Sequence, residues 1–147
     1  MIRDMDTGMS SEAIKSHLRQ RFPVIMVDRV LEMEPGKRIK ALKNVTSNEL
    51  LSSGHFNPGV FIIEAIGQCA CILFSQTTSR GQHANEFLVL GTINEMKLFV
   101  SVLPGQTMIL EVSILKMLAG AALVEGTVTV DGTLIAKGKL SFGQKTP

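Results

Sequence analysis

The sequence lacks tryptophan and tyrosine altogether, and it has little net charge. Fifteen Lys and Arg residues against thirteen Asp and Glu residues leave a net charge of +2, with no run of like charges. Proteins that bind nucleic acid need a concentrated basic surface, and those that bind single strands also stack bases on aromatic side chains. We therefore expect no nucleic-acid partner, whereas the slight positive excess still permits an acidic one.

Cysteine is also scarce, with only Cys69 and Cys71, which lie two positions apart in an apolar run. In a helix their side chains point in different directions, so no disulfide is expected between them. The pair lacks the spacing and the further ligands of a zinc site, and the glycines form no phosphate-binding motif. Ser53 has no nucleophile-elbow sequence around it. We expect neither a metal nor a cofactor.

Long apolar segments of the kind found in leaders and membrane spans are missing as well. Residues 1–11 carry three charged side chains and no apolar core, unlike a signal peptide. The apolar run Val60–Phe74 is 15 residues long (74 − 60 + 1), fewer than the roughly 20 residues that cross a bilayer. We expect a cytoplasmic protein without membrane contact, in which a flexible segment 1–11 precedes a single domain, residues 12–147.

Apolar patterns and turn signals predict two helices and six strands. A short helix is expected from Ser10, a favoured capping residue, to Leu18. A long apolar helix is expected from Pro58 to about Ser75, because an asparagine followed by proline is a favoured helix start. The predicted strands are residues 24–34, 38–46, 87–102, 107–117, 122–130 and 134–142.

The turn signals between these strands indicate how they are arranged. Asp131-Gly132 between two β-rich runs predicts a type I′ hairpin, and Pro104-Gly105 and Ala119-Gly120 mark further breaks. Strands joined by turns favour an antiparallel meander, and so apolar a helix must be covered by other elements. The predicted fold class is therefore α+β, an antiparallel β-sheet wrapped around one long central helix.

His55 is the one histidine of three that stands just before a predicted helix start. The first N–H groups of that helix, at Gly59, Val60 and Phe61, have no acceptor within the helix and can polarise a carbonyl oxygen. An imidazole beside them can move a proton next to that carbonyl. The alternative is a structural or solvated loop histidine.

Glu64 is the only charged residue between His55 and Arg80. An apolar environment favours the protonated carboxyl, which can donate a proton to a leaving oxygen while a neutral histidine acts as base. Gln68 follows at i+4 on the same helix face, and we expect it to line the substrate site together with Gly59 and Val60. Glu64 alone could simply complement the helix dipole, but a carboxyl and an amide in so apolar a helix indicate a polar cavity or partner.

Several short motifs follow one another along most of residues 14–142. They are Arg21-Phe22-Pro23, Val27-Asp28-Arg29-Val30, Glu34-Pro35-Gly36-Lys37-Arg38, Lys43-Asn44-Val45-Thr46, Gly54-His55-Phe56, Pro58-Gly59-Val60, Ile63-Glu64-Ala65 and Gln68. In this order they resemble the 3-hydroxyacyl-[acyl-carrier-protein] dehydratases of the FabZ type. The resemblance implies a hot-dog fold and an obligate homodimer, and it leaves open a trimer of dimers.

The resemblance also implies an activity, the removal of water from a 3-hydroxyacyl thioester to give a trans-2-enoyl thioester in fatty-acid or polyketide-type synthesis. The acyl group would be carried on acyl carrier protein or coenzyme A. His55 matches the histidine that removes the C2 proton, Glu64 matches the acid that assists departure of the hydroxyl, and Gly59 matches the glycine whose N–H polarises the thioester carbonyl. In this family the histidine of one subunit faces the glutamate of the other. Glutamate, where related dehydratase-isomerases have aspartate, implies dehydration without double-bond migration.

The sequence departs from the family pattern between the histidine and the helix. Only Asn57 separates Phe56 from Pro58, where the family usually has a longer proline-rich loop, so His55 and Glu64 are 9 positions apart (64 − 55). Two alternatives to a dehydratase stay open: a hot-dog acyl thioesterase in which Glu64 activates water, and a non-catalytic acyl-binding or partner subunit.

Overall fold

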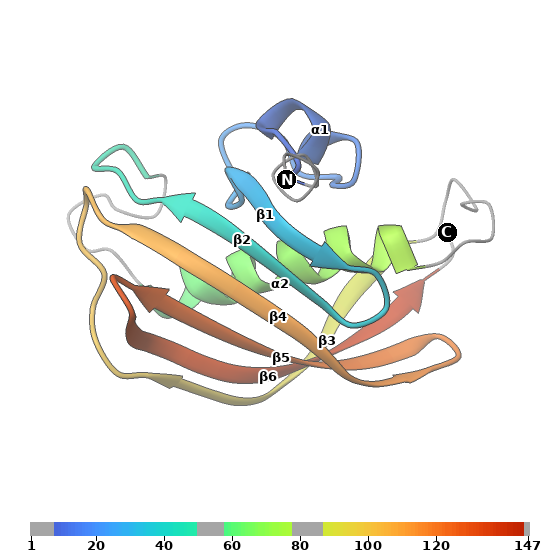
Figure 1. The fold of residues 1–147 in the computed structure, drawn as a ribbon. Coiled ribbons are helices and arrows are strands. Elements are labelled where there is room, and N and C mark those ends of the chain that lie inside the picture. Colours follow the sequence, from blue (N-terminus) through green and yellow to red (C-terminus); the bar gives the residue numbers. More distant parts are fainter. Residues whose placement is uncertain (1–7, 50–57, 78–86, 146–147) are drawn as a thin grey trace.

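The computed structural model describes residues 8–49, 58–77 and 87–145. Figure 1 shows their helices and strands. Along the chain a short helix and a β-hairpin come first, the long helix follows, and four strands complete the described part. The elements are α1 (Ser11–Lys15), β1 (Arg29–Glu34), β2 (Arg38–Asn44), α2 (Pro58–Thr77), β3 (Phe87–Leu98), β4 (Thr107–Leu118), β5 (Ala121–Val130) and β6 (Thr133–Lys145). Each predicted element is present.

The six strands form one antiparallel sheet in the order β1-β2-β4-β5-β6-β3. The predicted meander is correct for β4, β5 and β6 but wrong for β3, which pairs with β6 at the sheet edge. After β3 the chain crosses the end of the sheet, where Gly105 N–H donates to Val45 O at 2.8 Å and Val45 N–H donates to Gln106 O at 2.9 Å. These bonds attach the crossing segment to the end of β2, so its Pro-Gly turn belongs to a crossover and not to a hairpin.

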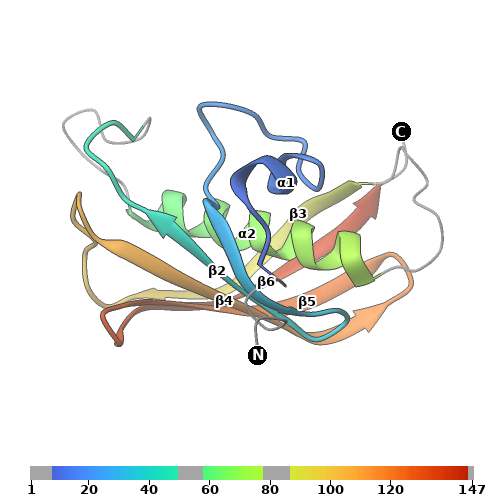
Figure 2. The same ribbon diagram turned by 45° about the horizontal axis from the view of Figure 1, so that its top comes forward.

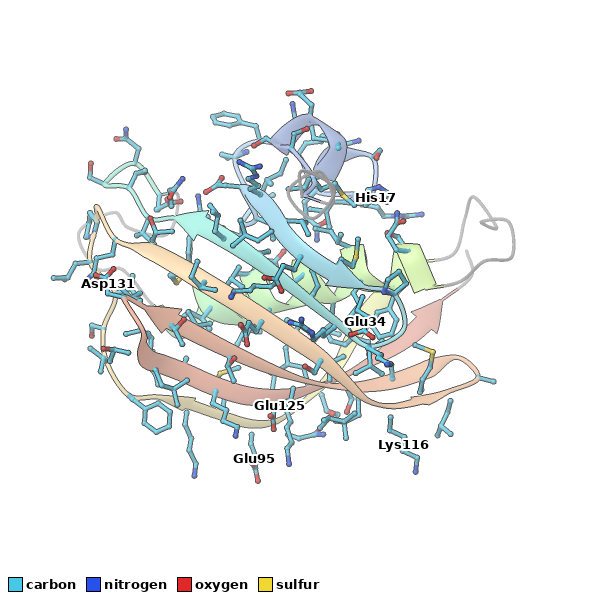
Figure 3. The ribbon with its side chains drawn as sticks, in the orientation of Figure 1. His17, Glu34, Glu95, Lys116, Glu125 and Asp131 are labelled. Atoms are coloured by element: carbon cyan, nitrogen blue, oxygen red, sulfur yellow. The ribbon has the colours of Figure 1, made fainter. Side chains whose placement is uncertain are left out.

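The sheet curls around α2, which lies along its concave side (Figure 1, Figure 2). The helix contacts the backbone of β5 directly, because a Cβ at Gly126 would come within 2.7 Å of Ile66 Cγ2. Charged side chains such as Glu95 and Lys116 point away from the helix, from the outer face of the sheet (Figure 3). The expected α+β hot-dog arrangement, a sheet wrapped around one central helix, is confirmed.

By length and composition alone α2 could cross a membrane over the 18-residue window Gly59–Gln76, which is longer than the 15-residue run that we considered. In the structure 56% of this window is buried. The fully buried side chains of α2 include Phe61, Ile62, Ile66, Ile72 and Leu73. α2 thus has the burial of a core helix, as predicted.

The predicted hairpin turns have the expected backbone. Asp131 and Gly132 have φ angles of 49° and 78°, both positive as a type I′ turn requires, and Val130 pairs with Thr133 across the turn. Before β2, Lys37 N–H donates to Glu34 O at 3.0 Å and closes the predicted turn there. These local signals fix the hairpins β1–β2 and β5–β6.

α1 is shorter than predicted and ends at Lys15, not at Leu18. Ser10 caps its start as expected, since its hydroxyl oxygen accepts from Ala13 N–H at 3.3 Å. At the other end the Ser16 hydroxyl donates to Ala13 O at 2.7 Å, so it occupies the carbonyl that a further helical turn would use.

The strand predicted from residue 24 begins only at Arg29. The backbone before it is bonded to α2 instead of to a strand: Met26 N–H donates to Gln68 Oε1 at 2.7 Å, and Gln68 Nε2 donates to Val24 O at 2.8 Å. β3 likewise ends at Leu98 and not at residue 102, because the next two N–H groups both point at one carbonyl, Ile135 O.

The N-terminal segment contributes one contact to the sheet. Met9, inside the segment 1–11 that was expected to be flexible, exchanges two backbone hydrogen bonds of 3.0 Å with Val30 in β1. The division of the chain into segment 1–11 and a single domain, residues 12–147, stays a prediction.

Candidate active site

α2 is covered by the sheet along one side and partly uncovered along the other. Between residues 60 and 74 the residues that are not buried lie three or four positions apart along one helix face and are Val60, Ile63, Glu64, Gly67, Cys71 and Phe74. We call this stripe the open side of α2. The sequence places a single ionisable carboxyl on it, Glu64, among apolar neighbours.

The Glu64 carboxylate is held through one of its two oxygens. Gln68 Nε2 donates to Glu64 Oε1 at 2.8 Å, and Gln20 Nε2 donates to the same oxygen at 3.4 Å. Gln68 stands one helical turn further along α2, whereas Gln20 comes from the segment between α1 and β1. Two amide donors on one oxygen fix the direction in which the carboxyl group faces.

Gln68 is fully buried, and both the oxygen and the nitrogen of its side-chain amide have protein partners. Its Nε2 donates to Glu64 Oε1 and to Val24 O, both at 2.8 Å, and its Oε1 accepts from Met26 N–H at 2.7 Å. The amide therefore fastens residues 24–26 to α2 and orients Glu64. This geometry fits a residue that supports the site, and the predicted contact of Gln68 with substrate stays a prediction.

The two cysteines of α2 are free, as expected. Burial, and secondly the charge of Glu64, raises the pKa of the Cys71 thiol to about 11. Burial also raises the pKa of Cys69, with a smaller contribution from Cys71. Both thiols are protonated at neutral pH, so neither is an activated nucleophile.

A second polar cluster lies between the sheet and the start of α2. Lys43 Nζ is 3.3 Å from Glu49 Oε1 and 3.6 Å from Asp28 Oδ2, and it stands 5.9 Å from the centroid of the Phe61 ring. The side chains of Lys43 and Glu49 are each only 9% exposed. The sequence analysis missed this lysine, although Ile39, Ala41 and Val45 alternate with it on the inward face of β2.

The remaining predicted site residues divide into two groups. His55 lies outside the described residues, so its predicted role as base stays a prediction. Gly59 and Val60 occupy the first turn of α2, with Val60 on the open side, and their predicted contacts with substrate are likewise untested. Glu64 and Gln68 are the two predicted residues that the structure brings into contact.

Other chemistries receive no support from the described residues. Ser75 Oγ is 3.0 Å from His17 Nδ1, but the hydroxyl donates to Ile72 O at 2.6 Å and is therefore not poised for proton transfer to the ring. In the part of the chain that the structure describes, no three His, Cys, Asp or Glu residues gather as metal ligands.

The relation to known proteins is decided by sequence. The family model of the FabA-like domain matches residues 18–139. The FabZ 3-hydroxyacyl-[acyl-carrier-protein] dehydratase of Clostridium kluyveri is 40% identical over 144 residues, which covers 94% of this chain and 96% of the relative. The FabZ dehydratase of Colwellia psychrerythraea is 41% identical over 138 residues, covering 90% and 91%. This chain belongs to the FabZ family of FabA-like proteins.

Solved structures agree on the fold. A dehydratase heterocomplex from Xenorhabdus doucetiae contains a chain that superposes with a TM-score of 0.77 at 18% identity, covering 90% of this chain and 91% of that one. A protein of Streptococcus mutans solved with acetyl coenzyme A superposes with a TM-score of 0.67 at 17% identity, covering 88% and 97%. At these identities the likeness concerns the hot-dog fold alone.

Proposed function

We propose that this protein is a hydro-lyase that removes water from 3-hydroxyacyl thioesters carried on acyl carrier protein, and that it does so in cytoplasmic fatty-acid synthesis. The observation that carries the proposal is the 40% identity to a FabZ dehydratase over 94% of the chain. Such a match includes the whole of α2 and its open side, where Glu64 is the one carboxyl.

The reaction divides between a base and an acid. His55 takes the proton from C2, the electron pair of that C–H bond forms the C2=C3 double bond, and the C3–O bond breaks. Glu64 gives its proton to the departing hydroxyl, which leaves as water. The N–H of Gly59 stabilises the negative charge that develops on the thioester oxygen.

The hydrogen bonds of Glu64 assign its two oxygens to different tasks. Oε1 accepts from Gln68 and from Gln20, and an oxygen that accepts two N–H groups is a poor place for a proton. We therefore assign the acidic proton of the proposed mechanism to Oε2, the oxygen that these two amides leave for the substrate. Gln68, buried and bonded on both sides, keeps the carboxyl from rotating.

A homodimer is part of this proposal and is supported by two surfaces. β3 is an edge strand of 12 residues, and Val89, Leu90 and Ile93 on it are each at least 40% exposed. A long, apolar edge strand is a site for pairing with another chain. The open side of α2 is a second apolar surface that the sheet of one subunit leaves partly uncovered, and a second copy related by two-fold symmetry can cover both.

The deciding experiment follows purified protein with 3-hydroxyacyl and trans-2-enoyl thioesters on acyl carrier protein and on coenzyme A. We expect the two thioesters to interconvert, seen as a change in enoyl absorbance, without release of free thiol. Thiol release would identify a thioesterase instead. Absence of both signals over several chain lengths would leave a non-catalytic acyl-binding subunit.

A further inference from the structure

We propose that Gly67 is a specificity-determining residue, whose missing side chain keeps the open side of α2 clear beside Glu64 for the acyl chain of the substrate. The inference rests on the proposed function, because it concerns the substrate range of that same site. It starts from a glycine in the interior of a 20-residue helix, where glycine is less stable than alanine since the flexible backbone loses more entropy on folding.

Packing within the subunit does not require this glycine. At Gly126 in β5 a Cβ would come within 2.7 Å of Ile66, so that strand needs glycine to admit the helix. A Cβ at Gly67 would meet only the Phe142 ring besides its own helix, at 3.9 Å, which is an ordinary van der Waals contact. Alanine would therefore fit within the subunit and favour the helix more. The space that glycine leaves is thus available to a group that approaches α2 from outside.

The position of Gly67 relative to the proposed acid identifies that group. Gly67 follows Glu64 by three positions on the open side, about 4.5 Å further along the helix axis. In the proposed reaction Glu64 protonates the hydroxyl on C3, and the thioester oxygen lies at the N–H of Gly59, before Glu64 in the helix. The acyl chain beyond C3 therefore continues in the other direction, past Gly67.

The surface beyond Gly67 suits an alkyl chain. Cys71 and Phe74 follow on the open side, and the Phe74 ring packs edge-on against Phe142 with their centroids 6.4 Å apart. Phe74 stands about 15 Å from Glu64 along the helix axis, and no charged residue lies between them in the sequence. Burial of alkyl groups on such a surface is favourable. The substrate class that follows is 3-hydroxyacyl thioesters with chains longer than butyryl.

The test adds side-chain atoms at Gly67 and compares two chain lengths on acyl carrier protein. The wild type should use 3-hydroxydecanoyl at least as well as 3-hydroxybutyryl thioester. Gly67→Leu should lower kcat/KM for the decanoyl substrate by about tenfold or more relative to the butyryl one, because single methylene groups in apolar sites discriminate on this scale. Gly67→Ala should shift the ratio in the same direction by less, and it should melt at or above the wild-type temperature.

Gly143→Ala and Gly143→Leu are the matched controls. Gly143 follows the inward-facing Phe142 on β6, and a Cβ there would meet nothing within 4 Å. Both controls should keep the wild-type ratio of the two substrates. If Gly67→Leu does not fold, Gly67→Ala decides the test alone. A wild-type ratio in the Gly67 variants that fold would overturn the proposal.

Sedimentation of the same variants examines the other group that could use the space, a second copy of the chain. We expect the Gly67 variants to have the oligomeric state of the wild type. If they dissociate and lose activity equally on both chain lengths, Gly67 serves a contact between subunits and the proposal is wrong.

A binding measurement separates failure of this proposal from failure of the proposed function. Decanoyl and butyryl acyl carrier protein lack the 3-hydroxyl group and cannot be dehydrated, so calorimetry with them requires no dehydration. Gly67→Leu should weaken binding of the decanoyl form by about tenfold or more relative to the butyryl form. A wild type that makes no enoyl thioester disproves the proposed function, and the calorimetry then still decides the role of Gly67. An active wild type whose Gly67→Leu variant binds and uses both lengths in the wild-type ratio disproves that role and leaves the dehydratase intact.

Discussion

The two faces of the sheet carry the same kinds of polar residue in different settings. On the outer face Lys40 meets Glu111 at 3.6 Å, and Lys137 meets Glu125 at 3.8 Å, with exposed fractions between 29% and 50%. Figure 3 shows Glu125 on this outer face, with Glu95 and Lys116. On the inner face Lys43 of β2 contacts Glu49 and Asp28, and on α2 itself Glu64 likewise contacts two partner side chains, Gln20 and Gln68.

The difference shows how burial changes the energetics of the same kinds of charged and polar side chain. An exposed ion pair gains little because water solvates both charges and salt screens them. A buried or half-buried polar group has less such solvent, so it needs protein partners, and those partners determine its direction. The inner side chains are therefore held in fixed orientations by their partners, whereas the outer ones mainly keep the surface polar.

The largest expected effect comes from the inner carboxyl. Glu64→Gln keeps the shape of the side chain and an oxygen for Gln68 but removes the acid, so kcat for dehydration should fall by about a hundredfold or more. The melting temperature should stay near that of the wild type. Stopped-flow or steady-state enoyl absorbance measures the loss, and a variant with nearly normal kcat would remove Glu64 from the mechanism.

Mixed subunits extend this test to the proposed homodimer. His55→Ala and Glu64→Ala proteins should each be inactive, and exchange of their subunits should restore part of the activity if the acid and the base come from different chains. Mixed dimers that remain inactive would contradict a site shared between subunits in this chain, whose connection before α2 is short.

A smaller effect is expected from Gln68, which joins three groups on the inner side. Gln68→Leu removes three hydrogen bonds and leaves the buried Met26 N–H and the partly buried Val24 O without this partner, so the free energy of unfolding should fall by about 2 kcal/mol. We also expect kcat to fall while KM holds, because Glu64 loses its orienting donor. Denaturant unfolding and steady-state kinetics measure the two effects.

The matched control for this substitution is Gln76→Leu. Gln76 is an exposed glutamine on the same helix, bonded to His17 near the end of α2. Its replacement should change stability by less than about 0.5 kcal/mol. If Gln68→Leu raised KM and left the stability unchanged, the original prediction that Gln68 contacts substrate would be favoured over its role as a support.

Local patterns predicted the fold well where neighbours in sequence decide it. The Asp131-Gly132 turn and the apolar helix after Asn57 were both correct, because turn geometry and helix starts depend on a few adjacent residues. The crossing of the chain after β3 was missed, since its bonds to Val45 join residues about 60 positions apart (105 − 45), which no local pattern records.

The contact between Glu64 and Gln68 was predicted to a similar extent, whereas their roles stay predictions. Glu64 and Gln68 could be found because a carboxyl and an amide stand out in an apolar helix, and their spacing places them on one face. The bonds of Gln68 to residues 24–26 could not be found, because that segment also fits a strand pattern. Lys43 could have been found from the two-residue period of β2, which puts it on the inward face with Ile39 and Ala41.

The smallest expected effect belongs to the outer face. Lys40 and Glu111 stand directly opposite each other on β2 and β4, at 3.6 Å, with exposed fractions of 32% and 49%. A double-mutant cycle of Lys40→Met and Glu111→Gln should give a coupling free energy of about 0.2–1 kcal/mol, which falls as salt is added, because both charges are solvated. The same cycle on Lys43 and Glu49 should give a larger coupling that salt changes less, since those side chains are largely buried. Equal couplings with equal salt dependence in the two cycles would show that burial does not separate the two faces.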